Sequence, residues 1–395
     1  MVSQASSAMK SAINRLMYKI RIENSVTAID PEAWDALAKE RFYMSYGWLK
    51  SIEETAIDRV TPLYFVLERG DELLATAACY ESHRDNPYDL LNGFMLGRLE
   101  RLAGMFGLAF KPAFLCGPLR GAGEHVMVKG GLSGDESLSS LREMLDAIET
   151  EATRRGLPLF FTNVSELEAD LRKEFRSRGY NVTKVHPKNR LDIKWASFEE
   201  YMADRGTIVR KNYETFRHEI KRNRMAGVTF RELEQVEQEE RLYQLVSDHH
   251  YRLNLQPFPY ASNFFSVLKS NLGRDARILV AEKAGQIVGV VTLFHRGTSG
   301  WTTFIGLDYE ATRNDFTYFV LAYCKAIECG INAGMKRIDY GSMLYRVKKR
   351  RGCTVTQSFI YHKACSGMAH ALLRPWFLFH RLWYEKRKIP GLLSG

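Results

Sequence analysis

The sequence predicts an α/β protein made of two copies of one mixed unit. Residues 66–80 (VLERGDELLATAACY) and 280–294 (VAEKAGQIVGVVTLF) align without a gap, so that Glu68 matches Glu282 and Leu73 matches Ile287. Each stretch is an apolar strand, a short polar turn and a second apolar strand, which is the pattern of a β-hairpin. The same order of helices and strands then follows each hairpin, and such internal self-similarity indicates a repeated structural unit.

The first copy continues with a helix, a strand, a second helix and a last strand. Residues 140–156 carry apolar side chains at helical spacing and end at Gly156, a residue type that commonly closes a helix. The apolar run 157–164 follows as a strand. A short basic helix over 169–180 ends near Gly179, and residues 181–195 form the last predicted strand.

The second copy repeats this order. Residues 316–334 are a predicted helix that ends at Gly334, and residues 335–342 (MKRIDYGS) are the next strand. A basic helix over 344–353 closes at Gly352, and residues 354–363 form the last strand. We therefore predict a first domain over 1–196, a second over 197–367 and an amphipathic tail over 368–395.

Composition and charge narrow the class of protein. Of 395 residues, 45% are hydrophobic and 26% are charged, which is typical of a folded globular chain and excludes a disordered, collagen-like or coiled-coil protein. Six cysteines are too few for a disulfide scaffold. The net charge of +10 favours polyanionic partners such as nucleic acid, nucleotide phosphates or acidic lipid.

A basic helix is predicted at the junction of the two halves, over residues 207–226 (TIVRKNYETFRHEIKRNRMA). At helical spacing, Val209, Tyr213, Phe216 and Ile220 share one face, and lysine and arginine side chains crowd another. Like charges one turn apart repel each other, so a dense cationic face indicates a docking surface for phosphates; a merely solvated face is the alternative.

Three segments carry a resemblance to a known family. They are the helix RKNYETFRHEIKR, the run FIGLDYE before a long helix, and RIDYGSMLYRVKKRRGC, which contains a Tyr-x-x-Lys-x-x-x-Gly pattern at Tyr345, Lys348 and Gly352. Over roughly residues 30–365 the chain resembles the two-domain GNAT-fold acyltransferases. These include Fem-type aminoacyl-tRNA-dependent ligases of peptidoglycan synthesis and CelD-type acetyltransferases, and the CelD-type pattern fits best.

The resemblance implies two tandem GNAT-like domains, each a mixed, mostly antiparallel sheet flanked by helices. It implies an enzyme that transfers an acyl group, acetyl first of all, from acyl-CoA to an amine of a small-molecule, amino-sugar or cell-envelope acceptor. One alternative is a Fem-type transferase that takes its acyl group from aminoacyl-tRNA. The other is a non-catalytic binding protein on the same fold. The donor is a co-substrate in either enzyme, and no bound cofactor is expected.

One segment departs from the single-domain GNAT pattern. Those enzymes cradle the CoA pyrophosphate on a glycine-rich turn that opens the helix after their fourth strand. Here that place reads RNDFTY, with Arg313 followed by the bulky Phe316 and Tyr318. Fem-type and CelD-type relatives share this loss, so it does not separate the two donors.

The resemblance and the residue types nominate a set of site residues. A carboxylate can take the proton of the amine, and we expect Asp308, which ends one predicted strand, and Asp339, which lies on the next, to face a common cleft; a purely structural hydrogen-bonding role for each is the alternative. A tyrosine hydroxyl can donate to the leaving group, and cations can hold donor or acceptor phosphate. The predicted catalytic residues are Asp308, Asp339 and Tyr345, and the predicted substrate-binding residues are Lys348, Arg210, Lys211, Arg217 and Arg313.

No metal site is predicted, because His249 and His250 have no further ligand at usable spacing. The N-terminus lacks the pattern of a signal peptide and no uninterrupted apolar stretch is long enough to span a bilayer, so a cytoplasmic protein is expected. The tail mixes aromatic residues with Arg374 and Arg381, which permits either peripheral contact with an anionic membrane or a docked helix with a basic face.

Overall fold

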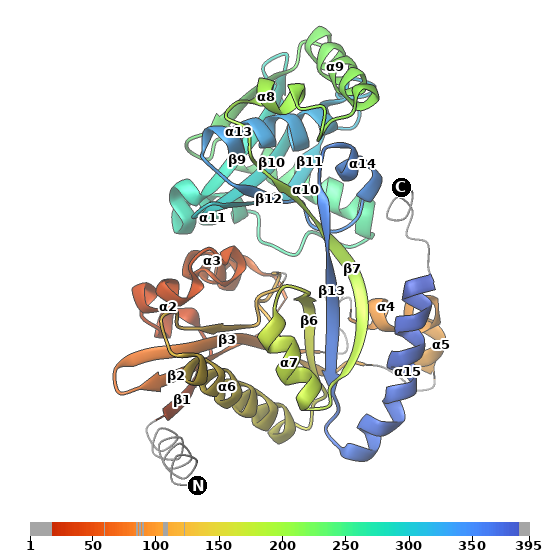
Figure 1. Ribbon diagram of the computed structural model, residues 1–395. Coiled ribbons are helices and arrows are strands. Elements are labelled where there is room, and N and C mark those ends of the chain that lie inside the picture. The colour runs from red at the N-terminus through yellow and green to blue at the C-terminus, as the bar shows by residue number, and fades with distance from the viewer. Residues whose placement is uncertain are drawn as a thin grey trace. The chain divides into compact units, whose positions relative to one another are not determined.

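The computed structural model describes residues 18–386, apart from residues 59, 84, 85, 87, 89, 90, 106–109 and 122. The chain forms two compact units. Unit 1 takes its described residues from Met1–Glu53, Arg59–Thr183 and Phe359–Arg381, and unit 2 takes them from Glu54–Asp58, Lys184–Ser358 and Leu382–Gly395. Each unit is a mixed sheet with helices packed on it (Figure 1).

Unit 1 is built on three antiparallel strands, β1, β2 and β3, followed in the sheet by β4 and then β6, which runs parallel to β4. The short β5 pairs separately with β3. The elements in chain order are β1 (Tyr18–Glu23), α2 (Pro31–Ala38), α3 (Tyr46–Thr55), β2 (Pro62–Arg69), β3 (Glu72–Ser82), α4 (Leu91–Leu96), η3 (Gly97–Leu99), α5 (Glu100–Met105), β4 (Ala113–Cys116), β5 (Val126–Val128), α6 (Gly134–Arg154), β6 (Leu159–Ser165) and α7 (Ala169–Ser177).

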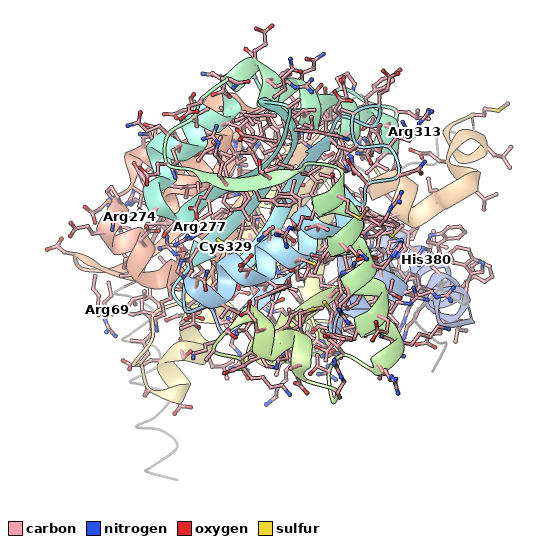
Figure 2. The ribbon with its side chains drawn as sticks, turned by 90° about the horizontal axis from the view of Figure 1, so that it is seen from above. Arg69, Arg274, Arg277, Arg313, Cys329 and His380 are labelled. Carbon is pink, nitrogen blue, oxygen red and sulfur yellow. The ribbon has the colours of Figure 1, made fainter. Side chains whose placement is uncertain are left out.

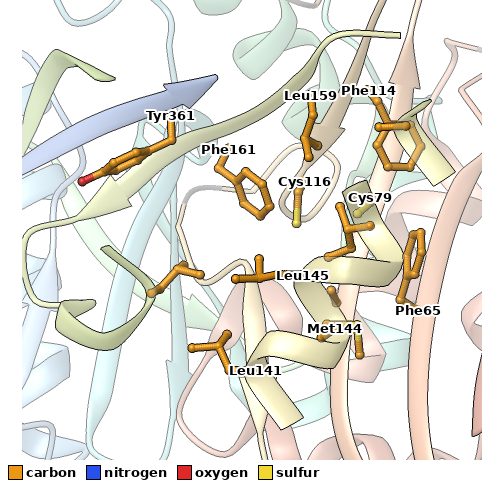
Figure 3. Close-up of a cluster of buried hydrophobic side chains, with 14 of the residues drawn as sticks. Phe65, Cys79, Phe114, Cys116, Leu141, Met144, Leu145, Leu159, Phe161 and Tyr361 are labelled. Carbon is orange, nitrogen blue, oxygen red and sulfur yellow. The ribbon is translucent and has the colours of Figure 1, made fainter. Parts of the chain in front are cut away.

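Helix α6 covers the sheet of unit 1. It begins with a capping box, in which the Ser133 hydroxyl accepts the backbone N–H of Glu136 and the Glu136 carboxylate accepts the backbone N–H of Ser133. Phe114 on β4 and Phe161 on β6 are fully buried beneath the helix (Figure 3). The side chains that α6 turns toward them lie three or four residues apart, at Leu141, Met144, Leu145 and Ile148.

His362 is a titratable group in the core of unit 1. It lies on β13 (Thr354–Lys363), fully buried, with the rings of Phe160 and Phe377 4.6 and 4.8 Å away between centroids. Burial lowers the pKa of His362 from 6.5 to about 3. The folded chain therefore keeps this side chain neutral at a pH where the unfolded chain already binds a proton, so the group favours unfolding as the pH falls below 6.5.

We expect this histidine to reduce the free energy of unfolding by about 2–3 kcal/mol between pH 7 and pH 4.5. Urea unfolding at both pH values measures the loss. His362→Phe keeps a ring in the same space and removes the titrating group, so this part of the pH dependence should disappear. His83→Phe is the matched control, because that side chain is 59% exposed. An unchanged loss on acidification in the His362→Phe protein would contradict the prediction.

Unit 2 has the strand order β7–β12–β11–β10–β9–β8. Strands β8 to β11 are antiparallel neighbours, β11 and β12 are parallel, and β12 and β7 are antiparallel. The remaining elements in chain order are β7 (Asn181–Asp192), α8 (Phe198–Ala203), α9 (Arg210–Met225), β8 (Thr229–Leu233), α10 (Glu239–Asn254), α11 (Phe264–Leu272), β9 (Ala276–Lys283), β10 (Gln286–Arg296), β11 (Ser299–Leu307), α12 (Thr317–Phe319), the π-helical η5 (Val320–Lys325), α13 (Ala326–Asn332), β12 (Arg337–Asp339), α14 (Tyr345–Arg350), β13 and α15 (Gly367–Lys386).

The predicted repeat is confirmed. Both hairpins form, as β2–β3 and β9–β10, and in each unit a helix connects two parallel strands, α6 between β4 and β6 and α12–α13 between β11 and β12. The basic helices after these strands form as α7 and α14, and the predicted helix 207–226 forms as α9. The chain is thus an α/β protein with two tandem copies of one mixed unit.

The last strand of each repeat crosses into the other half. Most of β7, the last strand of the first copy, belongs to unit 2 beside β12, and β13 of the second copy lies next to β6 and enters unit 1 from Phe359 on. The domain limits predicted from the sequence, at 196/197 and 367/368, divide the chain into consecutive stretches. The compact units are not consecutive stretches, because the boundaries between them fall within β7 and β13. The predicted domain limits therefore stay a prediction.

Candidate functional site

The candidate site lies where the two parallel strands of unit 2 part. β11 and β12 pair only over Ser299–Trp301 and Arg337–Asp339, after which β12 ends and β11 continues to Leu307. Beyond Trp301, the edge of β11 on the β12 side has no strand partner in the described part of the chain. Backbone N–H groups on such an edge are suited to bind a carbonyl oxygen that gains negative charge.

Asp339 lies at the point of parting. Its Oδ1 accepts the backbone N–H of Gly341 at 2.6 Å, and its Oδ2 accepts no hydrogen bond from the described residues. The Thr302 hydroxyl, one residue past the last strand pair, donates to the Asp339 carbonyl at 3.5 Å. A carboxylate with one unoccupied oxygen beside an open strand edge is suited to take a proton from an amine. This geometry favours the general-base role predicted for Asp339.

The loop after Asp339 has strained backbone. Met343 and Leu344 have φ angles of +67° and +49°, in the left-handed region that residues with a side chain seldom adopt. Gly341, with φ of +63°, meets the same requirement without a side-chain clash. Strain of this kind costs about 1–3 kcal/mol for each residue and persists only where other contacts hold the backbone.

Lys348 supplies such a contact. It lies on α14, is 5% exposed, and its ammonium group donates to the carbonyls of Tyr340 and Ser342 at 2.6 and 2.7 Å. Burial lowers the pKa of Lys348 to about 8. The electrostatic effects of Cys353 and Asp339 act in the opposite direction and raise this pKa, but they are smaller. The side chain points at the loop rather than at solvent, so we interpret it as a positioning residue; its predicted contact with substrate phosphate stays a prediction.

Tyr345 holds the same loop from its other end. The residue is buried, its hydroxyl donates to the carbonyl of Pro187 at 3.0 Å, and its ring contacts Tyr384. Burial raises the pKa of Tyr345 above its usual value, so the hydroxyl stays protonated. The structure thus brings Asp339, Tyr345 and Lys348 together around one loop, with the tyrosine hydroxyl already committed to a backbone carbonyl.

Asp308 lies at the far end of β11. It is seven positions beyond Trp301, the strand partner of Asp339, or roughly 20 Å along an extended chain. Its carboxylate accepts the Arg241 guanidinium at 2.8 Å and the backbone N–H of Ala311 at 2.9 Å. The Ala311 N–H and the Arg241 guanidinium hold the pKa of Asp308 below its usual value. The expectation of a common cleft for Asp308 and Asp339 was therefore wrong, because β11 runs well past the end of β12.

Arg313 is exposed on the loop that leads from β11 to α12 (Figure 2). Two residues later, Asp315 closes the N-terminus of the helix. This carboxylate is 3% exposed, accepts the backbone N–H of Thr317 at 3.0 Å and pairs with the Lys283 ammonium at 3.3 Å. The helix end at which the GNAT resemblance places a pyrophosphate is thus already occupied by an anion.

Helix α9 presents the predicted cationic face. Arg210, Lys211 and Arg217 are exposed, and Arg217 lies 4.0 Å from Glu214. The Asn212 amide donates to the carbonyl of Arg350 at 3.4 Å, so the start of α9 lies against the end of α14. One detail of the predicted apolar face was wrong. Val209 is 55% exposed because it precedes the first turn of the helix, whereas Phe216 is buried.

Sequence reasoning missed a buried ion pair in this region. Arg351 pairs with Glu219 of α9 at 2.8 Å, and both residues are almost completely buried. The Arg351 guanidinium also lies over the rings of Phe216 and Tyr323, at 4.5 and 4.4 Å from their centroids. The three-residue spacing of Tyr345, Lys348 and Arg351 on one helix face was the signal for burial.

Unit 1 contains a pocket of about 920 Å³ between α6 and the connection from β13 to α15. Lys363 pairs there with Glu149 at 2.6 Å, and Arg178 pairs with Asp146 at 2.6 Å. Because these charges compensate one another, the pocket has no strong preference for an anion or a cation. The described residues contain no group of three or more histidines, cysteines and carboxylates placed to hold a metal ion.

The fold and this site define the class of protein. A solved tandem GNAT protein from the clavulanic acid biosynthesis pathway is similar to the chain with a TM-score of 0.50 and 8% identity, over 88% of this chain and 99% of that one. The structure of FemX is similar with a TM-score of 0.55 and 11% identity, over 90% of this chain and 100% of FemX. At such identities the likeness shows the fold alone, that of two tandem GNAT-like units.

The family follows from the sequence. The model of the FemAB-like family, described as peptidoglycan biosynthesis/recognition, matches residues 25–378, and the chain belongs to this family. No curated protein sequence matches the chain. Among the residues that the structure describes, no helix is both long and apolar enough to cross a membrane.

Proposed function

We propose that this protein transfers an aminoacyl group from tRNA to an amine of a peptidoglycan precursor, and that unit 2 performs the reaction. The observation that carries the proposal is Asp339, a carboxylate with an unoccupied oxygen at the parting of β11 and β12. Membership of the FemAB-like family, with its description of peptidoglycan biosynthesis or recognition, supports the acceptor class.

The reaction needs no covalent enzyme intermediate. The amine attacks the ester carbonyl of the aminoacyl group while its proton passes to Asp339. The negative charge that develops on the carbonyl oxygen is stabilised by backbone N–H groups on the open edge of β11. The carbon–oxygen bond to the ribose then breaks, the leaving ribose oxygen takes up the proton that Asp339 received, and an amide remains. The strained loop at 341–344, held by Lys348 and Tyr345, positions Asp339 for this step.

The helix ends argue for tRNA over acyl-CoA as the donor. In unit 2 the Asp315 carboxylate accepts the backbone N–H of Thr317 at the start of α12, and in unit 1 the Glu136 carboxylate accepts the backbone N–H of Ser133, the residue before α6. Each carboxylate occupies one backbone N–H group at its helix end and would repel a CoA pyrophosphate there. Asp315 is also buried and paired with Lys283, so it cannot swing aside without loss of an ion pair.

The surface of α9 supports a large polyanionic donor. Six exposed cations, at Arg210, Lys211, Arg217, Lys221, Arg222 and Arg224, follow one another along the helix. Of these only Arg217 has an acidic partner within ion-pair distance in the described structure. Exposed cations without acids nearby bind nucleic-acid phosphates and release counterions, which makes the binding strongly dependent on salt.

We expect the double substitution Arg210→Glu and Lys211→Glu to weaken binding of aminoacyl-tRNA by at least about tenfold and to lower the slope of log K against log salt by about 2. Fluorescence anisotropy with labelled tRNA at several salt concentrations measures both. Lys173→Glu with Arg176→Glu is the matched control, because it makes the same charge change on exposed positions of α7 in unit 1. Equal weakening by the two double variants would contradict a specific role for α9.

A further inference from the structure

Helix α15 has apolar side chains on two opposite faces. Phe377 and His380 face the core of unit 1, and the imidazole of His380, labelled in Figure 2, lies 3.0 Å from the carbonyl of Phe94 on α4. The opposite face is exposed. A helix on the surface of a globular protein normally turns polar side chains to water, so an apolar outer face calls for a second apolar environment.

The outer face of α15 is apolar along its whole length in unit 1. Residues at positions 368, 371, 372, 375, 378 and 379 are spaced three and four apart, which places them on one side of the helix, and all are exposed and uncharged. The four largest of these side chains are more than half exposed: Met368 is 78%, Leu372 74%, Leu378 58% and Phe379 58% exposed.

A second apolar element lies beside this helix. The hydrogen bond from His380 to Phe94 joins α15 to α4, and Figure 1 shows α4 and α5 alongside α15. Large apolar side chains are exposed there too, at Phe94 (42%), Leu99 (49%), Leu102 (53%) and Met105 (81%). We call the exposed apolar residues of α15 and of α4–α5 the α15 surface.

The charges of these helices are mostly positive. Residues 91–105 and 367–386 contain Arg98, Arg101, Arg374, Arg381 and Lys386 against two acids, Glu100 and Glu385. Arg374 and Arg381 are exposed on α15, and they lie two helical turns apart, on the same side of the apolar face. Helices that lie in the headgroup region of anionic bilayers typically carry aromatic and aliphatic side chains on one face and arginines at its border.

We propose that the α15 surface rests on an anionic lipid bilayer, with α15 lying in the plane of the membrane. The apolar face would enter the boundary between headgroups and acyl chains, and Arg374 and Arg381 would meet the lipid phosphates. A second copy of this chain is the competing occupant, but two identical arginine-bordered surfaces would bring like charges together, whereas an anionic membrane complements them. The inference does not depend on which donor the enzyme uses.

Vesicle sedimentation tests the proposal with the full-length protein. We expect binding to vesicles of phosphatidylcholine with 30% phosphatidylglycerol, and binding at least several-fold weaker to pure phosphatidylcholine. Leu372→Gln with Phe379→Gln should weaken binding to the anionic vesicles by about tenfold or more, since two large apolar side chains no longer enter the lipid. Arg374→Glu should weaken it several-fold and make it less sensitive to salt.

Leu167→Gln is the control, because Leu167 is 67% exposed on unit 1 outside the α15 surface and should leave vesicle binding unchanged. Thermal unfolding of each variant shows that it is folded. Absence of binding to either vesicle, or equal binding by the Leu372→Gln/Phe379→Gln protein and wild type, would overturn the proposal. So would a dimer in analytical ultracentrifugation that this double variant dissociates while wild type shows no affinity for vesicles.

Discussion

Asp339→Asn should lower the turnover of acyl transfer by about 10²–10⁴-fold, the range that a positioned general base contributes. The amide has the same shape as the carboxylate, and its oxygen can still accept the Gly341 N–H, so the loop should keep its conformation. The amide cannot take up a proton from the amine. The expected signature is a fall in kcat with little change in donor binding, measured by the release of labelled amino acid from tRNA into an amide product.

Asp308→Asn makes the same chemical change at the other end of β11 and is the matched control. Its carboxylate is committed to Arg241 and to two backbone N–H groups, so we expect a modest loss of stability and near-normal turnover. If Asp308→Asn abolished transfer and Asp339→Asn did not, the site would lie at the far end of β11 and our placement would be wrong. Full transfer activity of both variants would exclude either carboxylate as the general base and would contradict the mechanism.

Arg351→Met should destabilise unit 2 by about 3–5 kcal/mol, because it leaves the Glu219 carboxylate buried without its partner. Methionine is close to arginine in length and can keep contact with Phe216 and Tyr323, so the loss is chiefly electrostatic. Urea unfolding followed by circular dichroism measures it. Arg351→Met together with Glu219→Gln should recover much of the lost stability, since no charge then remains buried.

The pH dependence of the Arg351→Met protein gives a second test. Burial raises the pKa of Glu219 even against the lowering effect of Arg351, and removing the arginine takes away the two largest lowering effects. A carboxyl whose pKa is raised in the folded state stabilises the fold at low pH and loses that contribution as the pH rises through the folded-state pKa. The loss of stability caused by Arg351→Met, relative to wild type at the same pH, should therefore be smaller at pH 5 than at pH 8. The opposite order would contradict the assignment of Glu219 as the buried charge.

Much of the fold could be predicted from local patterns. The hairpins at 66–80 and 280–294, the helix 140–156 and the helix 207–226 all appear, because alternation of apolar residues and glycine at helix ends act over a few residues. The exchange of β7 and β13 could not be predicted. The alternating burial of β7 shows which face of the strand is apolar. It does not determine which other strand pairs with β7.

The candidate site was predicted in part. The run around Asp339, Tyr345 and Lys348 was identified, and the structure brings these three residues together around one loop. Lys348 was predicted to bind substrate, and its charge alone did not indicate that its ammonium group is buried against the carbonyls of Tyr340 and Ser342. The sequence pattern did not predict that the Asp315 carboxylate accepts the Thr317 N–H at the start of α12. Its burial depends on Lys283, which is distant in sequence.

One measurement tests the central claim most directly: initial rates of transfer of the same alanyl group, presented as alanyl-tRNA or as alanyl-CoA, to a peptidoglycan precursor with a free lysine amine. The capped ends of α6 and α12 and the exposed cations of α9 predict an amide product from alanyl-tRNA. They predict no transfer from alanyl-CoA above the uncatalysed rate. Equal or faster transfer from the CoA thioester, with tRNA inert, would contradict the account.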